Sequence, residues 1–177
     1  MKNWNLYAVF GLASVYDTVL DERYLSLSGN TLSFNENTIS NVSGKVTLPL
    51  QYSGIDVREF GVNYGGSSSY KQAVSNITHI FWQKPTEQVQ CKLTSYINEA
   101  FSGWDKIIYV EIPDNVTHTF AIGSHCFDGC KNLFNNIKVT DADRMTFINR
   151  ITSFGELGFT SICSRYENIG IKFLGNC

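Results

Sequence analysis

Apolar residues between positions 45 and 140 recur at similar spacings. A first apolar residue is followed three positions later by a second and two positions later by a third, and the clearest set is Ile107, Val110 and Ile112, followed by Pro113. Related sets are Val46 and Leu48 with Pro49, then Ile77, Ile80 and Trp82, and then Leu133, Ile137 and Val139. Because the last two apolar positions of each set alternate with other residues, each set predicts a short strand with one buried face.

A second pattern places a phenylalanine five residues after an aromatic or aliphatic residue. Its three copies pair Tyr96 with Phe101, Ile122 with Phe127, and Phe154 with Phe159. The two patterns together define a unit of about 26 residues in about four copies, the third lengthened by residues 140–151. One such unit cannot bury its own apolar face, so neighbouring units are expected to stack and share a core. We therefore predict that Phe101, Phe127 and Phe159 are stacked in the interior.

The first 44 residues lack this repeat. Leu25, Leu27, Leu32 and Phe34 alternate around a Ser-Gly-Asn turn at 28–30, which predicts a β-hairpin. This stretch is also poor in charge and rich in aromatic residues, a composition typical of interface cores. We therefore divide the chain into an N-terminal docking and assembly piece, 1–44, and a repeat region, 45–177. The predicted assembly residues are Trp4, Tyr7, Phe10, Tyr16 and Tyr24.

Residues 93–117, LTSYINEAFSGWDKIIYVEIPDNVT, closely resemble the repeat of BspA-like leucine-rich repeat proteins. Residues 121–133 match its first half, and residues 46–61 resemble the usual lead-in repeat; Trp104 departs from the family's Cys and Cys126 from its Ala. The resemblance implies an α+β leucine-rich-repeat solenoid, with short parallel β-strands and few short helices, preceded by a small non-repeat piece. It also implies adhesion or ligand binding without catalysis.

The strand pattern predicts a ligand surface on the face opposite the core. Side chains between the apolar positions point to that face, and parallel strands about 4.8 Å apart bring them into columns. Besides Thr47, the predicted ligand-binding residues are His79, Phe81, Tyr109, Glu111, Phe134 and Lys138. Aromatic faces beside His, Glu and Lys suit a carbohydrate or a protein loop. The alternative is that a neighbouring subunit, or a different register of the fourth unit, covers these rings.

Composition limits the partners. The net charge is −2, charged residues make up 17% of the chain, and Lys and Arg are scattered singly, so no nucleic-acid partner is expected. No apolar stretch approaches the ~20 residues of a membrane span, so no membrane insertion is expected. The first 18 residues lack the uninterrupted apolar run of a signal peptide, and the five cysteines favour a chain made in reducing conditions.

The sequence gives little support for a catalytic site or a metal site. His125, Cys126 and Cys130 lack the second ligand pair that zinc sites usually have, and both cysteines fall on repeat positions expected to be buried. A Cys126–His125 nucleophile pair is disfavoured because neighbouring side chains of an extended chain diverge. No phosphate-binding glycine loop or zinc-protease motif occurs. We therefore predict a non-enzymatic protein without a metal or cofactor.

The expected role is that of a phage virion component, either a capsid decoration or a tail-fibre protein. Such a subunit would be part of an oligomer, contact other virion proteins, and present its repeat surface to a glycan or protein of the host cell. The alternative is a secreted or cell-surface adhesin of a bacterium or protist.

Overall fold

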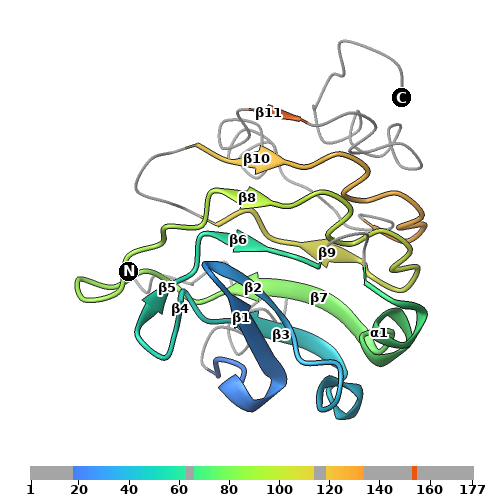
Figure 1. Ribbon diagram of the computed structural model, residues 1–177, viewed down its shortest axis with the longest axis horizontal. Helices are drawn as coiled ribbons and strands as arrows, with labels where there is room; N and C mark the ends of the chain where they lie inside the picture. Colours follow the sequence, from blue (N-terminus) through green and yellow to red (C-terminus); the bar gives the residue numbers. More distant parts are fainter. Residues whose placement is uncertain (1–17, 63–65, 114–118, 134–152, 155–177) are drawn as a thin grey trace, which may run out of the picture.

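The computed structural model describes residues 18–62, 66–113, 119–133 and 153–154, and Figure 1 shows how their strands and helices are arranged. The largest sheet has the strand order β1 (Leu25–Ser28), β2 (Thr31–Phe34), β6 (Glu59–Phe60), β8 (Ser95–Tyr96), β10 (Ala121–Ile122) and β11 (Ser153–Phe154). A second sheet has the order β3 (Gly44–Leu48), β7 (Ile77–Trp82) and β9 (Tyr109–Val110). The remaining elements are the hairpin of β4 (Gln51–Tyr52) and β5 (Ile55–Asp56), the 3₁₀ helices η2 (Glu22–Tyr24) and η3 (Ile39–Asn41), and the helix α1 (Ser68–Ala73).

The β1–β2 hairpin confirms the prediction for residues 25–34. The strands are antiparallel, with Leu25 opposite Phe34 and Ser28 opposite Thr31, and a two-residue turn joins them. Gly29, the first turn residue, has φ +62°, the conformation that a type II′ turn requires there and that glycine adopts at least cost. Leu25 and Phe34 are buried, so this hairpin contributes to the main core.

The six-stranded and three-stranded sheets enclose the core between them. In Figure 1, β6, β8, β10 and β11 lie one above another, and the β1–β2 hairpin passes in front of β3 and β7. The rings of Phe60 and Trp82, one from each sheet, meet edge to face with centroids 5.9 Å apart. The Trp82 Nε1–H donates to the Tyr96 hydroxyl at 3.0 Å, and that hydroxyl donates to the Glu111 carbonyl. A buried hydrogen-bond chain therefore ties the two sheets together.

Two successive turns, at residues 98–105 and 124–131, have the same backbone conformation. Glu99 and His125 have φ +57° and +52°, and Gly103 and Gly129 have φ +78° and +74°. The turn at 124–131 accepts three backbone hydrogen bonds from the turn at 98–105. The donors are the N–H groups of Glu99, Phe101 and Gly103, at 2.8, 2.9 and 2.7 Å. The recurring Phe-x-Gly of the sequence therefore corresponds to a repeated turn, in which the glycine supplies the left-handed conformation.

Phenylalanine rings stack through the core behind these turns. Phe60 and Phe101 have ring centroids 5.5 Å apart, and Phe101 and Phe127 have centroids 5.2 Å apart with nearly parallel planes. Phe101 is fully buried and Phe127 is 2% exposed. The prediction of stacked interior rings is confirmed for these two residues, and Phe159 lies outside the described residues.

The predicted leucine-rich-repeat solenoid is wrong. The described residues form mixed parallel and antiparallel sheets with few helices, and the antiparallel hairpin at 25–34 is part of the largest sheet rather than a piece preceding a solenoid. The strands that pair across the largest sheet lie 28, 36, 26 and 32 residues apart in sequence, so the 26-residue spacing holds for only one step. The local repeat of turn and core residues is therefore not a repeat of the whole fold.

Candidate binding site

The three-stranded sheet presents a row of polar and aromatic side chains on its face away from the core. Val46, Ile80 and Val110 are opposite one another and are buried in the core. Because side chains alternate along a strand, the preceding residues point to the other face. The register places Lys45 beside His79 and His79 beside Tyr109. We call Lys45, His79 and Tyr109 the outer row; the lysine is exposed and the two rings are half-buried.

The aromatic rings of this face form one cluster. The His79 and Phe81 rings are nearly parallel, with an interplanar angle of 7° and centroids 6.2 Å apart. The Tyr109 ring lies 6.5 Å from that of His79 and 5.3 Å from that of Phe81. These contacts restrict the ring orientations, so the edge of the imidazole is presented in a defined direction.

A hydrogen bond fixes the His79 ring further. The Thr78 hydroxyl and His79 Nδ1 are 2.8 Å apart, and within the described part of the chain the opposite nitrogen, Nε2, makes no hydrogen bond. Partial burial, and secondarily the charge of Lys45, lower the pKa of His79 below its ordinary value of 6.5. The ring is therefore mainly neutral at pH 7 and offers one nitrogen to a ligand.

The depressed pKa of His79 predicts a pH-dependent stability. The unfolded chain takes up this proton near pH 6.5, whereas the folded protein resists it. The stabilising contribution is complete above pH 6.5 and is lost as pH falls through the folded-state value. Urea unfolding at pH 7.5 and 5.5 should show a larger loss for the wild type than for His79→Gln, with His125→Gln as the matched control. An equal loss in wild type and His79→Gln would contradict the depressed pKa.

A second row on the same face is buried. Thr47 and Phe81 are adjacent in the register and are 2% and 1% exposed, and Glu111, just after β9, is 8% exposed. The Glu111 carboxylate accepts a hydrogen bond from the Trp82 backbone N–H at 2.8 Å, and the Lys84 ammonium lies 3.4 Å from it. The prediction that Phe81 and Glu111 are exposed on a ligand surface is therefore wrong, because both are packed within the protein.

The structure describes only some of the other predicted site and assembly residues. The strand alternation correctly brings His79 and Tyr109 together, but Phe134, Lys138 and the assembly residues Trp4, Tyr7, Phe10 and Tyr16 lie outside the described residues. Tyr24 is half-buried, and the Arg23 guanidinium lies 4.8 Å from the centre of its ring.

Sequence reasoning missed Lys45 and Thr78. Lys45 is two residues before Thr47, so the alternation that selected Thr47 also assigns Lys45 to the outer face. A first predicted strand that began two residues earlier would have included Lys45. Thr78 acts through the ring of its neighbour, and no spacing rule would have identified that contact.

The cysteines considered for chemistry are core residues. Cys126 and Cys130 are fully buried, and burial raises the pKa of the Cys126 thiol well above its usual range. The Cys130 thiol lies 3.0 Å from the Phe101 carbonyl oxygen, to which it donates. Among the described residues, no group of three or more His, Cys, Asp or Glu side chains is placed to hold a metal ion. No helix in the same ranges has the length and apolar character needed to cross a bilayer.

Comparisons with protein-family models, with curated proteins and with solved structures found no match to this chain.

Proposed function

We propose that this chain is a non-enzymatic binding protein whose outer row recognises a carboxylate-bearing carbohydrate on a cell surface. The observation that carries the proposal is the alignment of Lys45, His79 and Tyr109 across three hydrogen-bonded strands. With strands about 4.8 Å apart, this row spans about 10 Å of a rigid sheet.

The chemistry of the row suits an acidic sugar. Lys45 supplies an exposed positive charge, and the fixed imidazole of His79 supplies a hydrogen-bonding nitrogen beside it. A carboxylate placed between them would gain a charge-assisted hydrogen bond. The partly exposed Tyr109 ring offers an apolar edge for the C–H groups of a sugar ring.

Two settings agree with such a contact. The first is the surface of a phage virion, where the chain would be a capsid decoration or tail-fibre component bound to other virion proteins. The odd number of cysteines, five in the chain, suits assembly in the reducing interior of a host cell. A secreted or surface adhesin of a bacterium or protist is the alternative. Mass spectrometry of purified virions would detect the chain in the first setting only.

Loss of the Lys45 charge should weaken binding of an acidic oligosaccharide. We expect Lys45→Gln to lower the affinity for oligogalacturonate roughly tenfold or more, because hydrogen bonds to charged groups contribute ~1.5–3 kcal/mol. His79→Gln should lower it as well and should abolish the gain in affinity expected at acidic pH, where the imidazole takes up a proton. Isothermal titration calorimetry at pH 7.5 and 5.5 measures both effects.

Two controls make this test specific. Lys131→Gln removes an exposed lysine outside the row and should leave the affinity unchanged. Methyl-esterified oligogalacturonate keeps the sugar and lacks the charge, so it should bind weakly to wild type and variants alike. Equal binding of the acid and the ester, or unchanged binding by Lys45→Gln, would contradict the proposal.

A further inference from the structure

Among the described residues, the β1 strand forms an open edge of the largest sheet. It is the terminal strand in the sheet order, and no described residue pairs with its outer side. The Asn35 N–H donates to the Tyr24 carbonyl at 2.8 Å, which makes this pair hydrogen-bonded. Bonded and non-bonded pairs alternate along antiparallel strands, so the N–H and C=O groups of Ser26 and Ser28 face β2. The backbone groups of Leu25 and Leu27 therefore face the open edge.

Few of these outward backbone groups have a partner. The Leu25 N–H donates to the Glu22 carbonyl at the end of η2. Within the described residues this leaves the Leu25 carbonyl and both backbone groups of Leu27 facing outward from the sheet edge. Proteins usually protect such edges with lysine, proline or a bulge. The sequence of β1, Leu-Ser-Leu-Ser, has no charge and no proline, and its pairing with β2 has no register shift.

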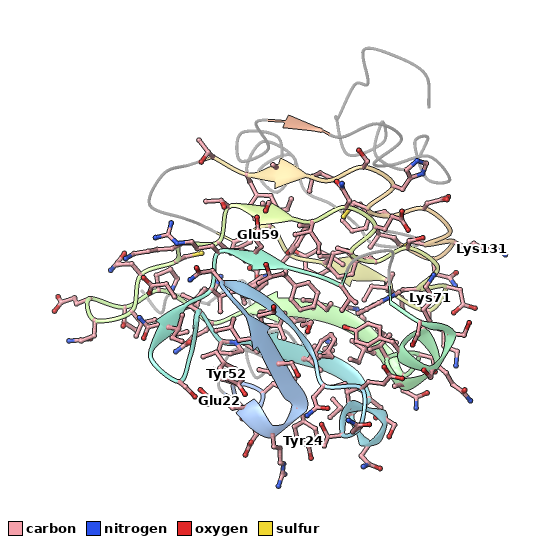
Figure 2. All side chains as sticks on the ribbon, viewed as in Figure 1. Glu22, Tyr24, Tyr52, Glu59, Lys71 and Lys131 are labelled. Carbon is pink, nitrogen blue, oxygen red and sulfur yellow. The ribbon has the colours of Figure 1, made fainter. Side chains whose placement is uncertain are left out.

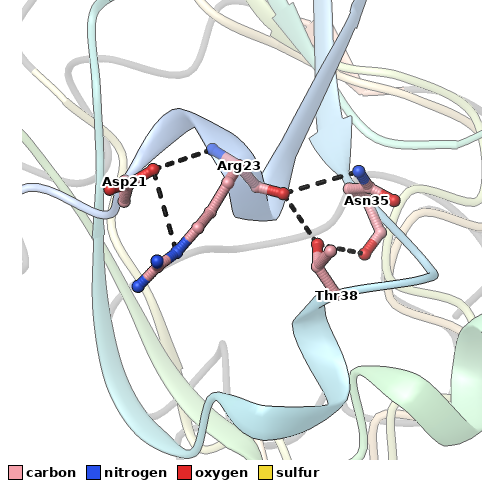
Figure 3. Close-up of polar contacts among 4 residues, drawn as sticks. All are labelled: Asp21, Arg23, Asn35 and Thr38. Atoms are coloured by element: carbon pink, nitrogen blue, oxygen red, sulfur yellow. Dashed lines mark hydrogen bonds and ion pairs between the residues drawn. The ribbon is translucent and has the colours of Figure 1, made fainter.

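Hydrogen bonds hold the start of this edge in place. Asp21 caps η2 by accepting from the Arg23 N–H at 2.9 Å, and the Arg23 carbonyl accepts from the Thr38 hydroxyl at 2.7 Å (Figure 3). Asn35 also donates to that carbonyl through its side chain, at 3.4 Å. A strand fixed in this way loses little conformational freedom when another strand pairs with it.

The β4–β5 hairpin lies beside the start of β1. Glu22 accepts hydrogen bonds from both the backbone N–H and the hydroxyl of Ser53, at 2.6 and 2.7 Å, so the tip of the β4–β5 hairpin lies beside the start of β1. Figure 2 shows Glu22, Tyr24 and Tyr52 at this lower end. On the same hairpin, Ile55 is 47% exposed, the large apolar residue most accessible to solvent among those described.

We propose that β1 pairs with β1 of a second copy of this chain, in an antiparallel dimer whose two-fold axis passes beside Leu27. In this register each Leu27 N–H donates to the carbonyl of the partner's Leu27. In this register, opposite side chains lie on the same face of the joined sheet. Leu25 and Leu27 lie toward the core side, and Ser26 is opposite the partner's Ser28 on the outer side. A second copy fits because the edge is self-complementary about this axis and has no charge to repel itself. The contact is short, so the dimer is reversible and depends on concentration.

Paired lysines should disrupt this dimer, and a charge exchange should restore it. In Ser26→Lys/Ser28→Lys, each introduced lysine is opposite an introduced lysine of the other copy. In Ser26→Lys/Ser28→Glu, each introduced lysine is opposite an introduced glutamate. Sedimentation velocity on the full chain, over a hundredfold range of concentration, should show a dimer for wild type, a monomer for the first variant and a dimer for the second. Ser40→Lys/Gln88→Lys adds the same charge at exposed sites outside β1 and should behave as wild type.

Several outcomes would overturn the proposal. A wild type that is monomeric at every concentration, or a Ser26→Lys/Ser28→Lys variant that dimerises normally, excludes pairing through β1. Failure of Ser26→Lys/Ser28→Glu to dimerise excludes the register through Leu27. Circular dichroism of each variant checks that the fold is intact. None of these outcomes depends on carbohydrate binding, so this inference and the proposed function are tested separately.

Discussion

Replacing Phe101 with alanine is expected to lower the free energy of unfolding by about 3–5 kcal/mol. The Phe101 ring is fully buried between those of Phe60 and Phe127, and it meets Tyr96 and Trp104 edge to face with centroids 5.0 and 5.3 Å away. Truncation would remove all these contacts and leave a cavity that the surrounding rings, held by both sheets, can fill only in part. Urea unfolding followed by tryptophan fluorescence measures the change.

Two comparisons separate this effect from a general loss of apolar surface. Phe101→Leu keeps most of the volume and should cost clearly less than Phe101→Ala. Ile55→Ala removes an apolar side chain from an exposed position and should change the stability by about 0.5 kcal/mol at most. If Phe101→Ala were as mild as Ile55→Ala, the ring stack would not be a main source of stability.

Gly123→Ala is expected to destabilise the protein by about 3 kcal/mol or more, at or above the upper end of ordinary overpacking costs. A Cβ atom at this position would lie 2.7 Å from the Ile97 carbonyl oxygen and closer still to the Asn98 amide nitrogen. Both are backbone atoms, and the Gly123 N–H donates to the Tyr96 carbonyl at 2.9 Å. Neither strand can therefore move away without breaking the hydrogen bonds between β8 and β10. Thermal and urea unfolding measure the loss.

Gly44→Ala is the matched control for this substitution. Gly44 has φ +77°, but a Cβ atom added there would meet no other atom within 4 Å, so alanine meets backbone strain without a clash. We expect a cost of about 1–2 kcal/mol. A soluble Gly123→Ala protein as stable as Gly44→Ala would show that the two strands are farther apart than the structure places them.

Local features of the fold were predictable because they depend on short stretches of sequence. The hairpin at 25–34 follows from alternation and a glycine at the turn, and the strands around Val46, Ile80 and Val110 follow from their apolar spacing. The burial of Phe101 and Phe127 follows from their recurrence in equivalent turns.

The global arrangement was not predictable in the same way. Which strands share a sheet is decided by contacts between distant residues, such as Leu32 with Phe60 across β2 and β6. The apolar pattern of the β1–β2 hairpin contains nothing that distinguishes a separate piece from the edge of a larger sheet. A turn that repeats with the same glycine and phenylalanine is compatible with more than one sheet arrangement, and the solenoid was only one of them.

The candidate site was also predictable only in part from the sequence. Alternation specifies the face of the sheet to which a side chain points, so it correctly placed His79 and Tyr109 together. It does not specify what covers that face, and it therefore failed for Phe81 and Glu111. Exposure depends on tertiary packing, and the pattern of a single strand has no information about it.

The outer row and the β1 edge belong to different sheets, so pairing through β1 uses none of the residues of the outer row. Pairing through β1 leaves Lys45, His79 and Tyr109 of each copy on the face of the other sheet. A dimer would then present two carbohydrate sites, and two weak contacts to a repetitive surface polysaccharide act together as one stronger attachment.

The most direct test of the proposed binding site is the NMR titration of the His79 imidazole, with and without oligogalacturonate. A carboxylate bound beside the ring favours the charged form, so the pKa of His79 should rise on binding, toward or above 6.5. The His79 ring resonances should shift on addition of the ligand at constant pH, while those of His125 should stay in place. A pKa of His79 that is the same with and without saturating ligand would contradict the assignment of the outer row as the binding site.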